Sequence, residues 1–439
     1  MKAEAPAPLT HRRVAALAGP IVLSNATVPL LGLVDAGVVG QMGAAAPLAA
    51  VGVGAAMLTA AYWLFGFLRM GTTGLAAQAL GAGDGPEAVA WLIRAVGIGA
   101  AAGVAMIALQ GPLIALALWA VPDLPEVEAL AAEYMAIRVW GAPATIALYG
   151  VTGWLVAKER TGAVLVVQVA MNGLNILLDL WFVLGLGWGV GGVAVATAIA
   201  EVSGAAIGLW FCRDALRADW GGRARLLAAA PLRRMASVNR DILIRSVLLL
   251  VSFRAFLLLG GREGEAQLAA NHVLLLFVEV TAYGLDGIAF ATETLVGQRV
   301  GARDRAGLRR AIRLTALWAG GLAVAMAAGF ALGGGALIDL LARDEAVREA
   351  ARAALPWMAA APVVAVASYM LDGIFIGATR TADMRNMMAL SCAVYAGALW
   401  AFAPWGNAGL WAALLVFLAA RGVTLAARYP ALERALTRA

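Results

Sequence analysis

Ionisable side chains inside long apolar segments are the residues of this chain best placed to do chemistry. Asp35 lies in one such segment near the start of the chain. Asn175 and Asp179 are four residues apart in a second segment, and Thr197 and Glu201 repeat that spacing in a third. Residues four apart share one face of a helix. A charge at the centre of a membrane helix costs ~2.5–3.5 kcal/mol on insertion scales, so we expect each acid to face a cavity or a partner.

These residues are predicted to form one polar cluster in the first half of the chain. The hydroxyl group of Tyr134 is expected to reach the same region. A buried carboxyl group beside other carboxyl groups can exchange a proton near neutral pH, which is what a proton-coupling site requires. Hydrogen bonding between helices with no role in transport is the alternative interpretation of the same residues.

A second set of ionisable residues recurs at an interval of seven: His272, Glu279, Asp286 and Glu293. Seven residues are nearly two helical turns, so the positions drift by only ~20° per step and share one face. The stripe would run ~31 Å at ~1.5 Å per residue, near the thickness of the hydrocarbon core of a bilayer. We therefore expect it to line a water-filled path, with Asp372 as a further acid in this half.

Three arginines also fall within apolar segments. Arg254 is predicted to form an ion pair with an acid of the stripe such as Glu279, which would make that pair structural. Arg69 is expected either to pair in a similar way or to extend its charged end to the membrane surface. Arg421, near the end of the last apolar segment, is expected to extend to the surface.

The elements that position these residues are expected to be membrane-spanning helices. Hydrophobic residues make up 62% of the 439 residues and charged residues 14%, and the mean hydropathy is +0.84. Uncharged runs such as 95–121 and 314–338 are longer than those of soluble core helices, and a bilayer explains them. We predict an all-α polytopic membrane protein with twelve transmembrane helices, at 15–39, 46–80, 89–119, 126–156, 161–186, 190–213, 238–261, 266–299, 307–341, 347–377, 384–404 and 407–428.

An internal duplication divides these helices into two sets of six. The string Gln78–Asp84 (QALGAGD) reappears 220 residues further on as Gln298–Asp304 (QRVGARD), and the same offset pairs Gly153 with Gly373. Duplicated bundles are a common plan for secondary transporters, in which the substrate path lies between the halves. We therefore predict two six-helix bundles, with an N-terminal lobe at 1–213, a cytoplasmic linker at 214–237 and a C-terminal lobe at 238–439.

The positions of lysine and arginine predict which side of the membrane each loop occupies. Basic residues gather in the loops after even-numbered spans, above all in the linker 214–237. The loop after the second span is an exception, because it carries Asp84 and Glu87 and no base. Basic loops face the cytoplasm, so both termini of this multi-pass protein are expected there. We expect a monomer surrounded by membrane lipids.

Several classes of function are disfavoured by the residue types present. The chain has no Gly-Lys-Ser/Thr phosphate-binding loop, so no ATPase of its own is expected. His11, His272, Cys212 and Cys392 have no metal-ligand spacing, so no metal or other cofactor is expected beyond a coupling ion. The net charge of +6 is explained by the basic loops rather than by nucleic acid. No catalytic constellation is evident, so an enzyme is not expected.

Five strings together give the chain a resemblance to a known family. They are Asp35–Gly40 (DAGVVG), Pro47–Gly52 (PLAAVG), Gly66–Leu75 (GFLRMGTTGL), Ala282–Gly287 (AYGLDG) and Leu371–Arg380 (LDGIFIGATR). The chain resembles the multidrug and toxic compound extrusion (MATE) transporters, most closely their DinF branch, over nearly its whole length. The resemblance implies two six-helix lobes around a central V-shaped cavity. It also implies antiport of organic, often cationic or lipophilic, compounds against inward H⁺ or Na⁺.

The resemblance also implies roles for particular residues. In the DinF branch the acid of the first helix is central to coupling, and Asp35 occupies that position. Other branches carry an acid within the seventh helix. The core of that helix in this chain, Ser246–Leu259, carries Arg254 and no acid, which favours H⁺ over Na⁺. The expected proton-coupling residues are Asp35, Tyr134, Asn175, Asp179, Thr197 and Glu201.

The expected function is therefore export of small organic compounds in exchange for inward H⁺ by alternating access, with Na⁺ as the alternative coupling ion. A flippase for lipid-linked precursors is an alternative within the same superfamily. Its anionic substrates would need several arginines in the cavity, whereas the intramembrane stripe is mostly acidic. A non-transporting receptor or a membrane-embedded enzyme is a further alternative, disfavoured by the duplication and by the missing catalytic residues.

Overall fold

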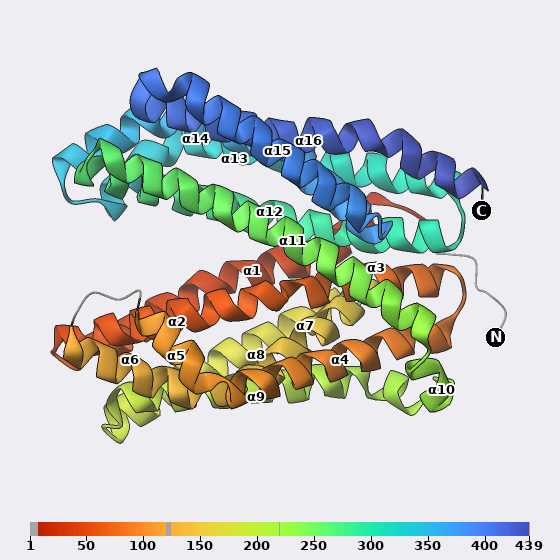
Figure 1. The fold of residues 1–439 in the computed structure, drawn as a ribbon, viewed down its shortest axis with the longest axis horizontal. Coiled ribbons are helices and arrows are strands. Elements are labelled where there is room, and N and C mark those ends of the chain that lie inside the picture. The colour runs from red at the N-terminus through yellow and green to blue at the C-terminus, as the bar shows by residue number, and fades with distance from the viewer. Residues whose placement is uncertain (1–7, 120–123, 219, 439) are drawn as a thin grey trace. The chain divides into compact units, whose positions relative to one another are not determined.

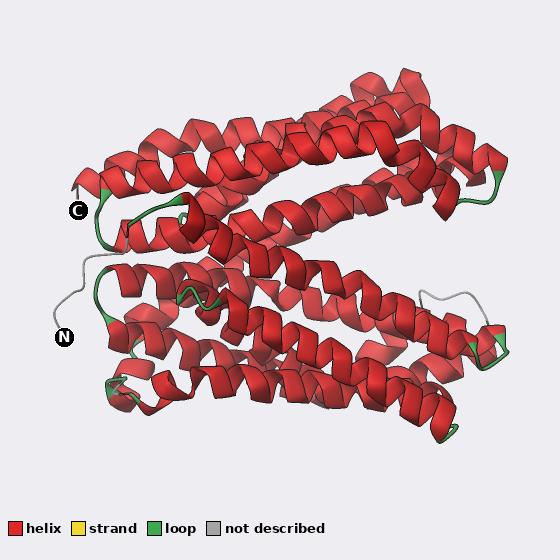
Figure 2. Ribbon diagram, turned by 180° about the vertical axis from the view of Figure 1, so that it is seen from behind, coloured by secondary structure: helices red, strands yellow, loops and turns green. Residues whose placement is uncertain are grey.

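The computed structural model describes residues 8–119, 124–218 and 220–438. Within these residues the chain is helical and contains no β-strand (Figure 2). Figure 1 shows the helices in chain order: α1 His11–Gly40, α2 Ala45–Trp63, α3 Phe67–Gly81, α4 Gly85–Ala108, α5 Gln110–Leu118, α6 Pro125–Arg138, α7 Ala142–Ala157, α8 Thr161–Asp179, α9 Gly189–Arg217, α10 Gly222–Leu226, α11 Ala229–Gly260, α12 Glu265–Gly301, α13 Arg305–Leu341, α14 Glu345–Gly377, α15 Thr381–Phe402 and α16 Gly406–Arg438.

Ten helical segments of the described chain are long and apolar enough to cross a membrane. Some of them combine two helices: Ala45–Gly81 joins α2 to α3 through the 3₁₀ turn η1, Leu64–Gly66, and Thr381–Leu436 includes both α15 and α16. The prediction of an all-α protein with many membrane spans is confirmed, and the number twelve stays a prediction. The bounds of single spans lie close to those expected, as with 266–299 against α12.

The contacts between residues divide the chain into two compact units. Unit 1 comprises Met1–Val22, Leu80–Gly83 and Arg234–Ala439, and unit 2 comprises Leu23–Ala79 and Asp84–Arg233. The first turns of α1 therefore belong to unit 1, whereas its second half, which carries Asp35, belongs to unit 2.

Aromatic rings fill the interior of unit 1. Phe256 of α11 packs edge-on against Trp411 of α16, with ring centroids 4.9 Å apart. Phe277 of α12 stacks on Phe330 of α13 at 5.3 Å. Lipid tails are as apolar as these side chains, so close packing rather than escape from water holds such helices together.

Small residues allow the helices of unit 2 to approach closely. A Cβ added at Gly99 of α4 would lie 2.7 Å from the backbone of Ala147 in α7, and one added at Gly103 would overlap Pro143. One added at Gly153 of α7 would overlap the backbone carbonyl of Arg69 in α3. Gly373 of α14, 220 residues after Gly153, is packed in the same way against the backbone of α12 in unit 1.

The 220-residue offset also recurs in the backbone at the ends of helices. Gly83 has φ 75° and Arg303 φ 54°, while Glu159 has φ 60° and Thr379 φ 51°. Left-handed backbone commonly ends a helix, and it is unusual for residues other than glycine. Two equivalent pairs of helix ends therefore share one backbone conformation although their side chains differ.

Asp84 follows Gly83 and Asp304 follows Arg303, and each aspartate caps the start of the next helix. The carboxylate of Asp84 accepts the backbone N–H of Glu87 at 3.0 Å, and that of Asp304 accepts the N–H of Gly307 at 2.8 Å. Each side chain thereby satisfies a backbone donor that the first turn of a helix leaves without a partner. The repeated string QALGAGD/QRVGARD thus ends one helix and caps the next in both halves.

Candidate functional site

Asp35 of α1 and Asp179 of α8 lie next to each other in unit 2, with their carboxyl groups close enough to interact directly. Asn175, one turn before Asp179, donates its side-chain amide to Oδ2 of Asp179 at 2.6 Å. The Oδ1 atom of each carboxyl group is buried and has no hydrogen-bond partner among the described residues. A buried acceptor without a donor is costly, so this arrangement suits two carboxyl groups that share a proton.

The helix geometry changes directly after Asp179. The chain continues from α8 into η3, Leu180–Gly185, whose hydrogen bonds have the π-helical pattern. Segments of π-helix are rare and occur often at functional sites. Asp179 thus lies where the helix widens, which apolar periodicity alone could not have predicted.

Arg138, at the end of α6, is the centre of a second polar group in unit 2. Its guanidinium donates to the hydroxyl of Tyr134 and to Oε1 of Glu201, both at 3.1 Å. The hydroxyl of Tyr62 in α2 donates to the backbone carbonyl of Arg138 at 3.4 Å. Thr197, one turn before Glu201, donates instead to a carbonyl of its own helix at 2.9 Å.

The two polar groups of unit 2 share one neighbourhood. Arg138 attracts the carboxylate of Asp35 electrostatically, and Tyr134 also lies within range of that carboxylate. The residues expected to cluster, which come from α1, α6, α8 and α9, are therefore close in space. Glu201 is already paired with a cation, whereas Asp35 and Asp179 face each other.

A buried ion-pair triad lies in unit 1. Asp372 of α14 accepts hydrogen bonds from Arg245 of α11 and, at 2.8 Å, from Arg421 of α16. All three side chains are buried. The guanidinium of Arg421 also lies 5.9 Å from the ring centroid of Tyr369. The expectation that Arg421 extends to the membrane surface is wrong, because a buried carboxylate within reach stabilises its charge inside the protein.

The seven-residue stripe on α12 spans several environments rather than one. His272 and Glu279 are exposed, Asp286 is half-buried and Glu293 is buried. Burial increases along the helix because α14 packs closely on its later turns, where Gly377 lies against the backbone of Glu293. The role of the stripe as the wall of a path stays a prediction.

The arginines singled out from the sequence are placed differently from what was expected. Arg254 is exposed and forms no ion pair within the described part of the chain, so the predicted pair with Glu279 is wrong. Glu279 lies instead beside the hydroxyl of Tyr283, one turn along its own helix. Arg69 is buried and interacts electrostatically with Tyr149, which excludes extension to the membrane surface.

Sequence reasoning missed two arginines that hold these groups together, Arg138 and Arg245. Both lie inside predicted spans, and Arg138 follows Tyr134 at the same-face interval of four. The available signal was therefore a charged residue within a predicted span, the same signal that marks the acids.

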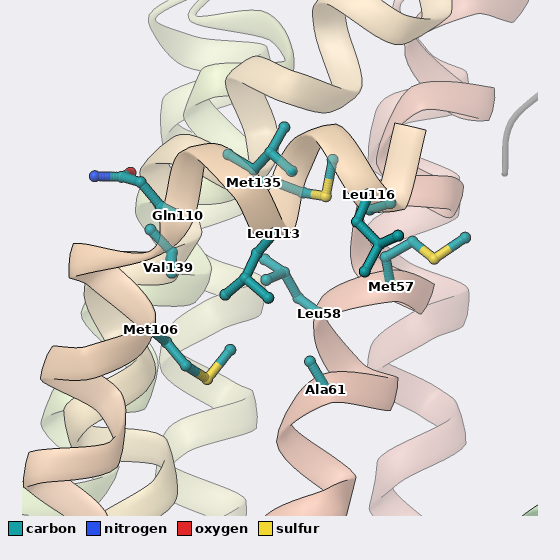
Figure 3. A pocket seen from close by; sticks show the side chains of 11 residues that line it. Met57, Leu58, Ala61, Met106, Gln110, Leu113, Leu116, Met135 and Val139 are labelled. Carbon is teal, nitrogen blue, oxygen red and sulfur yellow. The ribbon is translucent and has the colours of Figure 1, made fainter. Parts of the chain in front are cut away.

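A small apolar pocket of about 250 Å³ also lies in unit 2 (Figure 3). Met57, Met106 and Met135 contribute flexible thioethers to its lining, which suits apolar groups of varied shape. Met135 and Val139, which line the pocket, directly follow Tyr134 and Arg138 in the sequence, so the pocket and the residues around Arg138 adjoin the same stretch of backbone. Ligand pockets usually enclose ~300–1,000 Å³, so this one fits part of a substrate rather than the whole.

Comparison with known proteins agrees with this fold. The family model described as MatE matches residues 20–181 and 242–399. DNA damage-inducible protein F of Escherichia coli strain K12 is 41% identical over 415 residues, covering 94% of this chain and 90% of that protein. A probable multidrug resistance protein NorM of Xanthomonas campestris is 27% identical, covering 97% of this chain and 95% of that protein.

A solved structure shares the fold. The crystal structure of MATE in the bent conformation matches this chain with a TM-score of 0.88, covering 97% of each chain at 19% identity. The family match, the relative at 41% identity and the shared fold together confirm the resemblance found in the sequence: the chain belongs to the MatE family and is a multi-pass MATE transporter.

Proposed function

We propose that this transporter exports small organic compounds, often cationic or lipophilic, in exchange for inward H⁺ by alternating access. The observation that carries the proposal is the contact between the carboxyl groups of Asp35 and Asp179. Two carboxylates in contact in a poorly solvated site repel each other too strongly for both to be ionised, so such pairs hold a proton.

Loss of that proton would change the force between α1 and α8. With the proton present, the two carboxyl groups can share a hydrogen bond. Without it, two negative charges ~4 Å apart repel by ~4 kcal/mol at an effective dielectric constant of ~20. This exceeds the ~1–3 kcal/mol typical of coupling between sites, and a ligand shifts an equilibrium only by its differential affinity for the two states. The pair is thus strong enough to bias one state of the transporter over another.

The nature of the substrate is inferred from the same unit. Acids supply negative charge, and the pocket next to α6 accepts apolar groups. A relative named as a probable multidrug resistance protein supports small organic substrates. The basic loops support an orientation in an inner membrane with both termini in the cytoplasm.

Transport by purified protein in liposomes tests the proposal. An imposed pH gradient should drive efflux of a cationic dye, and a Na⁺ gradient alone should not. Asp35→Asn and Asp179→Asn should each abolish the proton-driven part. Asp214→Asn is the matched control, because Asp214 lies in the same unit with 75% of its side chain exposed and should transport normally. Unchanged proton-driven efflux in Asp35→Asn would refute the proposed coupling role of Asp35.

A further inference from the structure

We infer that Tyr62, Tyr134 and Glu201 form the subsite that holds the positive group of the substrate, and that Arg138 occupies this subsite as a tethered cation when no substrate is bound. The inference rests on the proposed function and names the residues that would recognise the charge of the substrate. It assigns to Glu201 a role in binding cations rather than protons.

The surroundings of Arg138 have the chemistry of an organic-cation site. Its guanidinium carbon lies 5.9 Å from the ring centroid of Tyr62 and 5.8 Å from that of Tyr134. A carboxylate oxygen of Glu201 lies 3.1 Å from the guanidinium on another side. Aromatic rings within about 6 Å of a cation attract it electrostatically, and rings combined with a carboxylate recognise quaternary ammonium and similar groups.

Arg138 fits this subsite loosely. Nε of Arg138 and Oε2 of Glu201 are both buried, and neither has a hydrogen-bond partner among the described residues. Charge-assisted N–H···O bonds are usually about 2.7–2.9 Å long, whereas the Arg138–Glu201 contact is 3.1 Å. The Arg94–Glu87 pair of the same unit is much tighter, at 2.6 Å. A cation that fills the subsite more completely would therefore compete well with Arg138.

The backbone makes room for Glu201 and places Arg138 at the end of a helix. A Cβ added at Gly141 would overlap Oε2 of Glu201, so the carboxylate fits there only because residue 141 is glycine. Arg138 is the last residue of α6, directly before the 3₁₀ turn η2, Val139–Gly141. Its side chain is 12% exposed against 8% for that of Glu201, and both tyrosines are buried. Arg138 is thus the most exposed of these four side chains and lies at the end of a helix.

Equilibrium binding of tetraphenylphosphonium to the detergent-purified full-length protein tests the inference without any ion gradient. Arg138→Gln should lower the Kd about tenfold, the change expected if Arg138 occupies the subsite about nine-tenths of the time. Arg94→Gln is the matched control, because Arg94 is also buried, pairs with a glutamate and lies 4.5 Å from the ring centroid of Trp91. It should leave the Kd unchanged.

A second pair of variants keeps the native arginine in place. Tyr62→Leu removes an aromatic wall and should raise the Kd for tetraphenylphosphonium about fivefold, whereas Tyr62→Phe keeps the ring and should leave it unchanged. Neither variant should alter binding of the neutral dye Nile red. An Arg138→Gln protein that folds, judged by circular dichroism, and binds the cation no more tightly than the native protein would overturn the inference.

If Arg138→Gln does not fold, Tyr62→Leu decides, and an unchanged Kd for tetraphenylphosphonium overturns the inference. Failure of the proposed function would be seen separately. If the substitutions change cation binding as expected but a pH gradient does not drive efflux, the inferred subsite stands and only the proposed proton coupling is refuted.

Discussion

Replacing Asp372 with asparagine is expected to destabilise unit 1 more than any change at its two arginine partners. The carboxylate of Asp372 is buried between Arg245 and Arg421 and is the acceptor for both. The substitution keeps the shape of the side chain and removes its charge. Two buried guanidinium groups would then lie side by side without the anion that holds them together.

The size of the effect follows from the geometry. At the 2.8 Å that separates Arg421 from Asp372, Coulomb attraction at an effective dielectric constant of ~20 is ~6 kcal/mol. Part of this is offset, because stripping a neutral asparagine of water costs less than stripping a carboxylate. Removal of one partner from a buried ion pair typically costs about 3–5 kcal/mol. We expect a loss in that range, with repulsion between the two arginines placing it toward the upper end.

Thermal unfolding in detergent measures this loss. At ~2 °C per kcal/mol for a unit of about this size, Asp372→Asn should lower the Tm by ~6–10 °C. Arg421→Gln should lower it less, because Arg245 still balances Asp372. The double variant Asp372→Asn/Arg421→Gln should recover part of the loss, since only one buried cation is then unpaired. A Tm within ~2 °C of the native value for Asp372→Asn, or a double variant less stable than the single one, would refute the electrostatic account.

Three further outcomes follow from packing and exposure. Gly153→Ala and Gly373→Ala should each lower the Tm by several degrees, because the added Cβ meets backbone atoms of a neighbouring helix, whereas Gly162→Ala meets nothing within 4 Å and should be neutral or slightly stabilising. Arg254→Gln should change stability by less than ~0.5 kcal/mol in detergent, since Arg254 is exposed; a larger loss would reveal a partner. Asp344→Ala should cost ~1 kcal/mol, because the carboxylate of Asp344 caps α14 by accepting two backbone N–H groups; an unchanged Tm would contradict that role.

The helices were predictable because their signal is local. A run of about 20 apolar residues must be helical in a bilayer, where only a helix satisfies its own backbone hydrogen bonds. The interruptions were predictable only in part. The break at Leu109 between α4 and α5 precedes Pro112, which has no N–H to bond the carbonyl of Ala108, the last residue of α4. The π-helical segment after Asp179 contains no proline, so no residue type in it predicts the change of geometry.

The candidate site was predictable in part. The interval of four placed Asn175 and Asp179 on one face, and the structure joins them by a hydrogen bond. The partners of the charged residues were predicted poorly: Arg254 has no ion pair within the described part of the chain, and Arg421 is buried rather than extended. A position in a helix limits which residues of that helix share a face, but it does not say which face meets another helix.

By itself, the sequence determined that this chain is an α-helical membrane protein, that it is duplicated, and which residues carry charge inside apolar segments. Hydropathy, repeats and charge are properties of residues and short segments, so they can be read along the chain. Only the tertiary structure decided that Asp35 meets Asp179, that Arg138 pairs with Glu201, and that two arginines hold Asp372. These contacts join helices far apart in sequence, and the electrostatic energy of a buried charge depends on the groups a few ångströms away in space.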